Sequence, residues 1–146
     1  MPNGAGGGGG GGIVGVGNSF TGPAQALELV GDHAYAYSGE VGSSSAGPTH
    51  LKFTSGNYYF VGRLTCNGAL KVADPNVGRT TIFTLTLNGG IVALIKVDSV
   101  EEDQPSTAYN DIIIPPYTEV EVTATSDTTT ADRLTTVLMS GRIYRG

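Results

Sequence analysis

The sequence contains no tryptophan, only one cysteine and few charged residues. Charged residues make up 14% of the 146 residues, below the roughly 25% of an average globular domain. The single cysteine, Cys66, excludes a disulfide within the chain, so packing must hold the domain together, as in a protein that folds in a reducing compartment. We expect Cys66 to be a small buried residue of a strand, and neither a nucleophile nor a metal ligand.

Charge and hydropathy argue against two classes of partner. The formal net charge is −5 and the isoelectric point is near 4.8. The eight basic residues are scattered, which argues against a nucleic-acid binder. The sequence has no run of 18 apolar residues, so we expect no membrane span. The N-terminal residues lack a basic region followed by a long apolar one, so we also expect no secretory signal.

The strongest pattern in the chain is a period of two, which predicts strands with one buried and one exposed face. Between residues 118 and 125, Val120, Val122 and Ala124 alternate with Glu and Thr. No helical period and no repeat of fixed length accompany this pattern, which favours an all-β sandwich or barrel. The expected strands are 26–30, 34–37, 50–53, 58–66, 69–73, 80–87, 91–97, 118–125 and 133–144.

Turn-type residues separate these strands. Asn67-Gly68 predicts a hairpin turn, and Asn88-Gly-Gly90 predicts a second turn. Residues 39–48 and 99–110 read as loops because they are rich in Gly and Ser and in acidic side chains, respectively. The polar segment 126–132 suits a loop between two antiparallel strands.

The N-terminal region differs from the rest of the chain. We therefore divide the chain into an arm, residues 1–24, and a β-sandwich domain, residues 25–146. Seven consecutive glycines occupy positions 6–12, and polyglycine has too much backbone entropy to fold alone. The region is either a flexible linker or an arm that lies across a partner. In the second case its apolar anchors are Ile13, Val14, Val16 and Phe20.

The titratable residues form no recognisable catalytic or metal-binding motif. His33 and His50 have no cysteine nearby and no paired metal spacing. The acidic run at 101–103 does not match a calcium loop, and Glu119 and Glu121 lie on one face of a strand without an aromatic platform. We therefore expect no enzyme activity, no metal and no cofactor.

Two strands are apolar on both faces. The outward positions of 80–87 and 91–97 include Ile82, Val92 and Leu94. A strand that is apolar on both faces must be covered on both, and a two-layer sandwich covers only one. A second subunit is the expected cover.

Three segments together resemble small phage head-decoration (cement) proteins, which have a jelly-roll or tumour-necrosis-factor-like β-sandwich that trimerises. The first is the Gly-Asn-Tyr-Tyr-Phe-Val-Gly-Arg strand that ends at Arg63. The second is the strand that ends in Leu-Asn-Gly at 87–89. The third is the closing pair, 112–125 and 134–145, which ends in Ser-Gly-Arg-Ile-Tyr. The resemblance covers residues 26–145.

The resemblance implies a jelly-roll-like antiparallel β-sandwich with a flexible Gly-rich arm, acting as a structural virion protein. The implied protein is a homotrimer on the outer surface of the capsid, assembled in the host cytoplasm, that contacts the major capsid protein and bridges capsomers. The arm residues would contact the capsid. The implied trimer interface is Tyr58, Tyr59, Phe60, Ile91, Ala93 and Ile95.

Other functions stay open at this point. A receptor- or carbohydrate-binding head of a phage fibre or spike could use the same fold. That reading would be favoured if the loops 39–48 and 99–110 formed an aromatic pocket, yet they carry only Tyr109. A major coat protein and a small β-fold hydrolase or isomerase are further alternatives.

Overall fold

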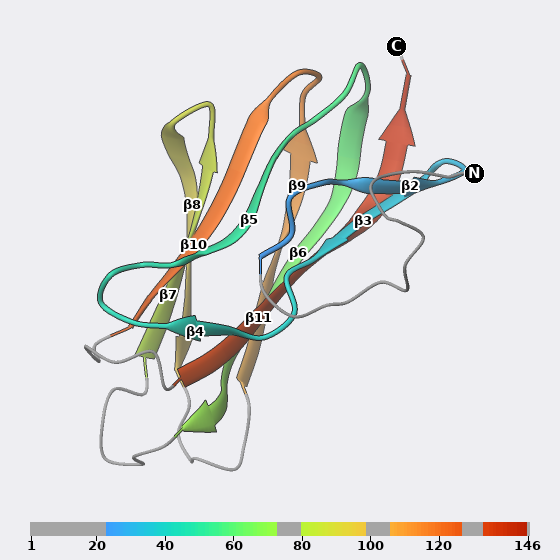
Figure 1. Ribbon diagram of the computed structural model, residues 1–146. Coiled ribbons are helices and arrows are strands. Elements are labelled where there is room, and N and C mark those ends of the chain that lie inside the picture. The colour runs from blue at the N-terminus through green and yellow to red at the C-terminus, as the bar shows by residue number, and fades with distance from the viewer. Residues whose placement is uncertain (1–22, 73–79, 99–105, 127–132, 146) are drawn as a thin grey trace.

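A computed structural model describes residues 23–72, 80–98, 106–126 and 133–145. These residues form ten strands, and there is no helix among them (Figure 1). In chain order the strands are β2 (Glu28–Val30), β3 (His33–Tyr37), β4 (Val41–Ser43), β5 (Thr49–Thr54), β6 (Tyr59–Val72), β7 (Thr80–Leu87), β8 (Gly90–Asp98), β9 (Ser106–Ile114), β10 (Glu119–Ser126) and β11 (Arg133–Tyr144).

The strands form two antiparallel sheets. One has four strands in the order β5-β10-β7-β8, and the other follows the order β2-β3-β11-β6-β9, with β4 pairing β11 beside that path. The pairing is nested around the turn between β7 and β8: β7 pairs β8, β6 pairs β9, β5 pairs β10 and β3 pairs β11. A long hairpin rolled up in this way is a jelly roll. The predicted all-β, jelly-roll-like sandwich is confirmed.

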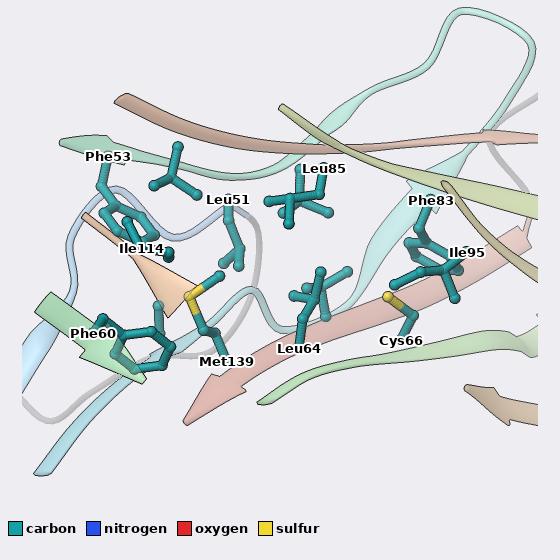
Figure 2. Close-up of a cluster of buried hydrophobic side chains, with 14 of the residues drawn as sticks. Leu51, Phe53, Phe60, Leu64, Cys66, Phe83, Leu85, Ile95, Ile114 and Met139 are labelled. Atoms are coloured by element: carbon teal, nitrogen blue, oxygen red, sulfur yellow. The ribbon is translucent and has the colours of Figure 1, made fainter. Parts of the chain in front are cut away.

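The core lies between the two sheets. Figure 2 shows Leu51, Phe83 and Leu85 of the four-stranded sheet facing Leu64, Cys66 and Met139 of the other sheet. All six side chains are buried. The predicted alternation in β10 is confirmed, because Val120, Val122 and Ala124 are fully buried while the residues between them reach the surface. Close packing of this kind is the main source of stability in a domain without disulfides.

One expected hairpin does not exist. Asn67 and Gly68 lie inside the 14-residue strand β6, so the predicted turn there is wrong. A Cβ atom on Gly68 would lie 2.9 Å from Val97 Cγ1, which shows that glycine is present for close packing. Asn67 Nδ2 donates to Thr136 Oγ1, close to a shift in the register between β6 and β11. The Asn67-Gly68 dipeptide lies at an irregularity of the strand, and such irregularities favour small residues as turns do.

Two loop boundaries and one strand pairing also differ from the expectations. The loop predicted at 39–48 contains β4, and the loop predicted at 99–110 ends in the first residues of β9. The closing strands β10 and β11 do not pair with each other, because they lie in different sheets. A period of two shows that one face is buried, but it carries no information on which strand is the neighbour.

Candidate functional site

The outer face of the larger sheet gathers exposed aromatic, apolar and charged side chains. They come from the neighbouring strands β9, β6 and β11. The residues that alternate with them, such as Phe60, Leu64 and Met139, are buried. Because successive side chains of a strand point to opposite faces, the exposed side chains point to solvent. We call the set the β6 surface; its members are Tyr59, Val61, Arg63, Tyr109, Asp111, Ile113, Ser140, Arg142 and Tyr144.

Strand register places these side chains in rows across the face. Tyr59 lies opposite Tyr144, and Val61 lies opposite Ile113 on one side and Arg142 on the other. Tyr144 is 54% exposed and Ile113 is 61% exposed. Directly opposed residues on one face are within contact distance. The rows therefore form a continuous apolar area at one end of the sheet.

An ion pair lies at the centre of the β6 surface. Arg63 Nε donates to Asp111 Oδ1 at 2.8 Å, and Arg63 Nη2 donates to Oδ2 at 3.5 Å. The guanidinium carbon also lies 3.9 Å from the centre of the Tyr109 ring. The hydrogen bond with Arg63 lowers the pKa of Asp111, and the same bond raises the pKa of Arg63. The guanidinium is thus held on one side by a carboxylate and on the other by a ring.

A shallow hollow of about 510 Å³ opens beside this pair. Its side-chain walls are Val61 and Ile113, which are apolar, and Arg63, Asp111 and Ser140, which are polar. Arg63 faces Ser140 across the strands and leans the other way, toward β9. A long side chain next to a short one leaves the space open.

A second exposed apolar area lies on the outer side of the smaller sheet. Ile82 of β7 and Ile91, Val92 and Leu94 of β8 are between 39% and 67% exposed; we call them the β8 patch. Strand β8 is at the edge of its sheet, and a register shift beside Val92 interrupts its pairing with β7. The outward positions of Ile82, Val92 and Leu94 agree with the sequence analysis.

The structure separates the residues expected at the trimer interface. Phe60, Tyr58 and Ile95 are core residues of the single chain, and Ala93 is partly buried against that core. Tyr59 and Ile91 are exposed, on the β6 surface and the β8 patch, respectively. Because the buried members cannot reach a partner without opening the sandwich, only these last two are available for contact. The trimer itself stays a prediction.

The arm residues Ile13, Val14, Val16 and Phe20 lie outside the described residues, as does the acidic run at 101–103. No group of three or more potential metal ligands occurs within the described ranges. In the same part of the chain, no helix is long and apolar enough to cross a membrane.

Among the described residues, Cys66 and His50 are titratable side chains that are fully buried in the core. Cys66 is fully buried, as expected, and burial raises the pKa of its thiol to about 12, which keeps the thiol protonated at neutral pH. His50 is also fully buried, and burial lowers its pKa to about 4, against the opposing effect of a hydrogen bond to the Pro48 carbonyl oxygen. By contrast, His33 lies on the surface, with Nδ1 at 3.1 Å from Asp32 Oδ1.

Comparisons with known proteins do not identify the chain. No protein-family model matches it, and no curated protein matches its sequence.

Sequence reasoning found part of each surface. It gave Asp111 no role, and it counted Tyr109 as the one aromatic residue of the loops predicted at 39–48 and 99–110. It also gave Arg63 no role in a site. In the structure, Val61 and Ile113 are out of phase with the buried residues of their strands. The sequence carried no such signal, because their neighbours Phe60, Ile112 and Ile114 are apolar as well.

Proposed function

We propose that this chain is a structural protein that covers and bridges other protein surfaces, as do the capsid decoration proteins that it resembles. The observation that carries the proposal is the β8 patch. Four large apolar side chains on two paired strands are exposed in the single chain. Neighbouring exposed apolar side chains of this kind mark protein contact sites.

Self-association is the simplest way to cover the β8 patch. Each Å² of apolar surface removed from water contributes about 25 cal/mol, and a closed ring of identical subunits repeats that gain at every interface. Strand β8 is also an edge strand, with backbone groups on one side that no other described strand pairs. Covering an edge of this kind prevents uncontrolled aggregation.

The buried titratable groups favour binding over catalysis. The Cys66 thiol and the His50 imidazole have no exposed surface, so neither can meet a substrate from solution. The exposed side chains of Arg63 and Asp111 are paired with each other.

In this proposal the protein is a homotrimer on the outer surface of a phage capsid. It contacts the major capsid protein and bridges capsomers, with the N-terminal arm adding contacts. Each contact can be weak, because three linked subunits bind together and their effective concentration multiplies the affinity.

The first test is the mass of the purified protein in solution, measured by sedimentation equilibrium. We expect the full chain to sediment as a trimer. Leu94→Lys places a charge in the interface, and we expect it to raise the concentration for half-assembly by about tenfold or more. Thr54→Lys adds the same charge at an exposed position of β5 in the same sheet and is expected to leave the mass unchanged.

The second test is binding to heads of the encoding virus assembled without this protein. The full chain should bind and protect them against heat, and Leu94→Lys should protect them less. A protein that is monomeric at every concentration and binds no heads would contradict the proposal. Binding to host-cell glycans without binding to heads would instead support the receptor-binding alternative.

A further inference from the structure

The hollow beside Arg63 and Asp111 has the composition of a small ligand site. We propose that it binds a neutral, hydroxyl-rich ligand, namely a single hexose or hexosamine unit of a glycan. The inference does not depend on the decoration role, because it rests on the opposite face of the sandwich from the β8 patch.

The ion pair offers donors and acceptors side by side. A guanidinium has five N–H groups in one plane, and the two bonds to Asp111 use two of them. The carboxylate likewise has more lone pairs than the two bonds use. A hydroxyl both donates and accepts, so two neighbouring sugar hydroxyls can bond to Arg63 and Asp111 together. Ser140, on the wall of the hollow, adds a third polar group.

The apolar walls of the hollow fit the apolar faces of a sugar ring. Val61 and Ile113 are cross-strand neighbours, respectively 40% and 61% exposed, and both line the hollow. Apolar walls with a few placed polar groups are the usual composition of small-molecule sites. The C–H faces of a pyranose ring supply the matching apolar surface.

Electrostatics favours a neutral ligand over an anion. The charge of Arg63 is already offset by Asp111 at 2.8 Å, and the whole chain carries a formal net charge of −5. An anionic ligand would approach a negatively charged protein and compete with a carboxylate that is already in place. A neutral sugar meets neither barrier.

The polar part of the site is held in position before a ligand arrives. Arg63 is fixed by two hydrogen bonds and by the Tyr109 ring at 3.9 Å from its guanidinium carbon. Fixing a long side chain in advance removes an entropic cost of binding. The hollow is open, so we expect weak affinity for one unit, with a Kd of about 1 mM, and stronger binding where several copies act together.

The test is a titration of the full-length, ¹⁵N-labelled protein, followed by NMR. The probes are the methyl glycosides of glucose, galactose, mannose and N-acetylglucosamine, with N-acetylneuraminic acid as the anionic comparison. We expect saturable shifts of the Arg63 Nε–H signal and of the backbone amides of Val61, Asp111 and Ile113 with at least one neutral sugar. We expect a smaller effect from the anionic sugar.

Substitutions connect the shifts to the ion pair. Arg63→Lys keeps the charge but loses the planar donor group, and we expect it to weaken binding by about tenfold or more. Arg142→Lys is the matched control. It makes the same change on the same face, at a residue that pairs with Asp32 and does not line the hollow, and it should leave the affinity unchanged.

Three results would overturn the proposal. One is the absence of saturable shifts around the hollow with every neutral sugar. Another is tighter binding of the anionic sugar, which would change the ligand class. The third is an equal loss of affinity in the two Arg→Lys variants, which would show a general effect of charge or hydration on this face.

Discussion

His50 is the polar residue that joins the two sheets through the core. Its Nε2 lies 2.7 Å from Thr135 Oγ1, its Nδ1 lies 3.3 Å from the Pro48 carbonyl oxygen, and the Thr135 hydroxyl donates to the Val41 carbonyl at 3.1 Å. A neutral imidazole and a hydroxyl hold two protons for these three contacts. Protonation of the ring would supply a proton for the third contact. Burial opposes the charge, however, and lowers the pKa of His50 to about 4. Desolvation outweighs the additional hydrogen bond.

This balance predicts a loss of stability in mild acid. The unfolded chain binds a proton at His50 near pH 6.5, whereas the folded chain resists it down to about pH 4. The loss of stability is therefore absent above pH 6.5 and grows as the pH falls, reaching about 3 kcal/mol near pH 4. Urea unfolding across this range measures it. His50→Gln should remove most of the pH dependence between these values; an unchanged dependence in the variant would assign it to other groups.

A pair of glycines lets β6 and β11 approach each other closely. Gly62 and Gly141 are opposite each other in the register. A Cβ atom on Gly141 would overlap the Val61 carbonyl oxygen and lie 2.5 Å from Gly62 Cα. On the other strand, a Cβ atom on Gly62 would lie 2.6 Å from Phe60 Cζ. The ring of Phe60 thus fills the space that a side chain on Gly62 would need.

We expect Gly141→Ala to destabilise the protein by about 3 kcal/mol, because the overlap is with backbone atoms that cannot move aside. Gly90→Ala is the matched control: its nearest contact is 3.6 Å, to the Leu87 carbonyl oxygen. The control should change the free energy of unfolding by less than about 0.5 kcal/mol. Thermal and urea unfolding of both variants provide the measurement. Equal effects would mean that the close approach of the strands is unimportant.

At the scale of elements, the turn between β7 and β8 is the point around which the other strands nest. Asn88 adopts φ 51° and Gly89 adopts φ 82°, as a two-residue hairpin turn requires. Asn88 also ties this turn to the start of β10. Its side-chain oxygen accepts from the Glu119 N–H at 2.9 Å, and its own N–H donates to the Glu119 carbonyl oxygen at 2.8 Å.

Asn88→Ala should therefore cost about 2 kcal/mol, because it removes a hydrogen bond and places alanine in the left-handed region. Asn88→Gly loses the same bond without that strain, and we expect it to be about 1 kcal/mol less harmful. Urea unfolding of the pair separates the two contributions. If the glycine variant were as unstable as the alanine variant, backbone strain would have no part in the effect.

The same elements show what local sequence can and cannot predict. Asn88-Gly89 and Asn67-Gly68 are the same dipeptide, yet only the first makes a turn. The difference is Val97, which packs against Gly68 from a strand about 30 residues away and is invisible to a local pattern. Alternation was reliable in β10, where only one phase is apolar.

Alternation was less informative at the candidate interface residues. Tyr58, Tyr59, Phe60 and Val61 are all apolar or aromatic, so both phases look buried from sequence alone. The structure buries Tyr58 and Phe60 and exposes the other two. The pairing of Arg63 with Asp111 joins residues 48 positions apart, which no local rule could bring together. Telling the exposed interface residues from the buried ones, and finding most of the hollow, therefore needed the sheet register.

For the whole molecule, the sandwich gives the chain two separate surfaces with exposed apolar side chains. The β6 surface belongs to one sheet and the β8 patch to the other, and the core of Figure 2 lies between them. The two outer faces of a sandwich point in opposite directions. A subunit that uses the β8 patch for self-association therefore leaves the hollow open to solvent.

This arrangement predicts that the two proposed activities can be removed one at a time. Leu94→Lys should dissociate the oligomer and leave the affinity for a single sugar unchanged, whereas Arg63→Lys should weaken sugar binding and leave the mass unchanged. In the double variant each loss should be as large as in the corresponding single variant, because effects at distant sites without shared contacts add. Sedimentation and NMR titration of the four proteins measure this directly. If Arg63→Lys instead dissociated the oligomer, the β6 surface would be the subunit interface, and the hollow would be covered in the assembled protein.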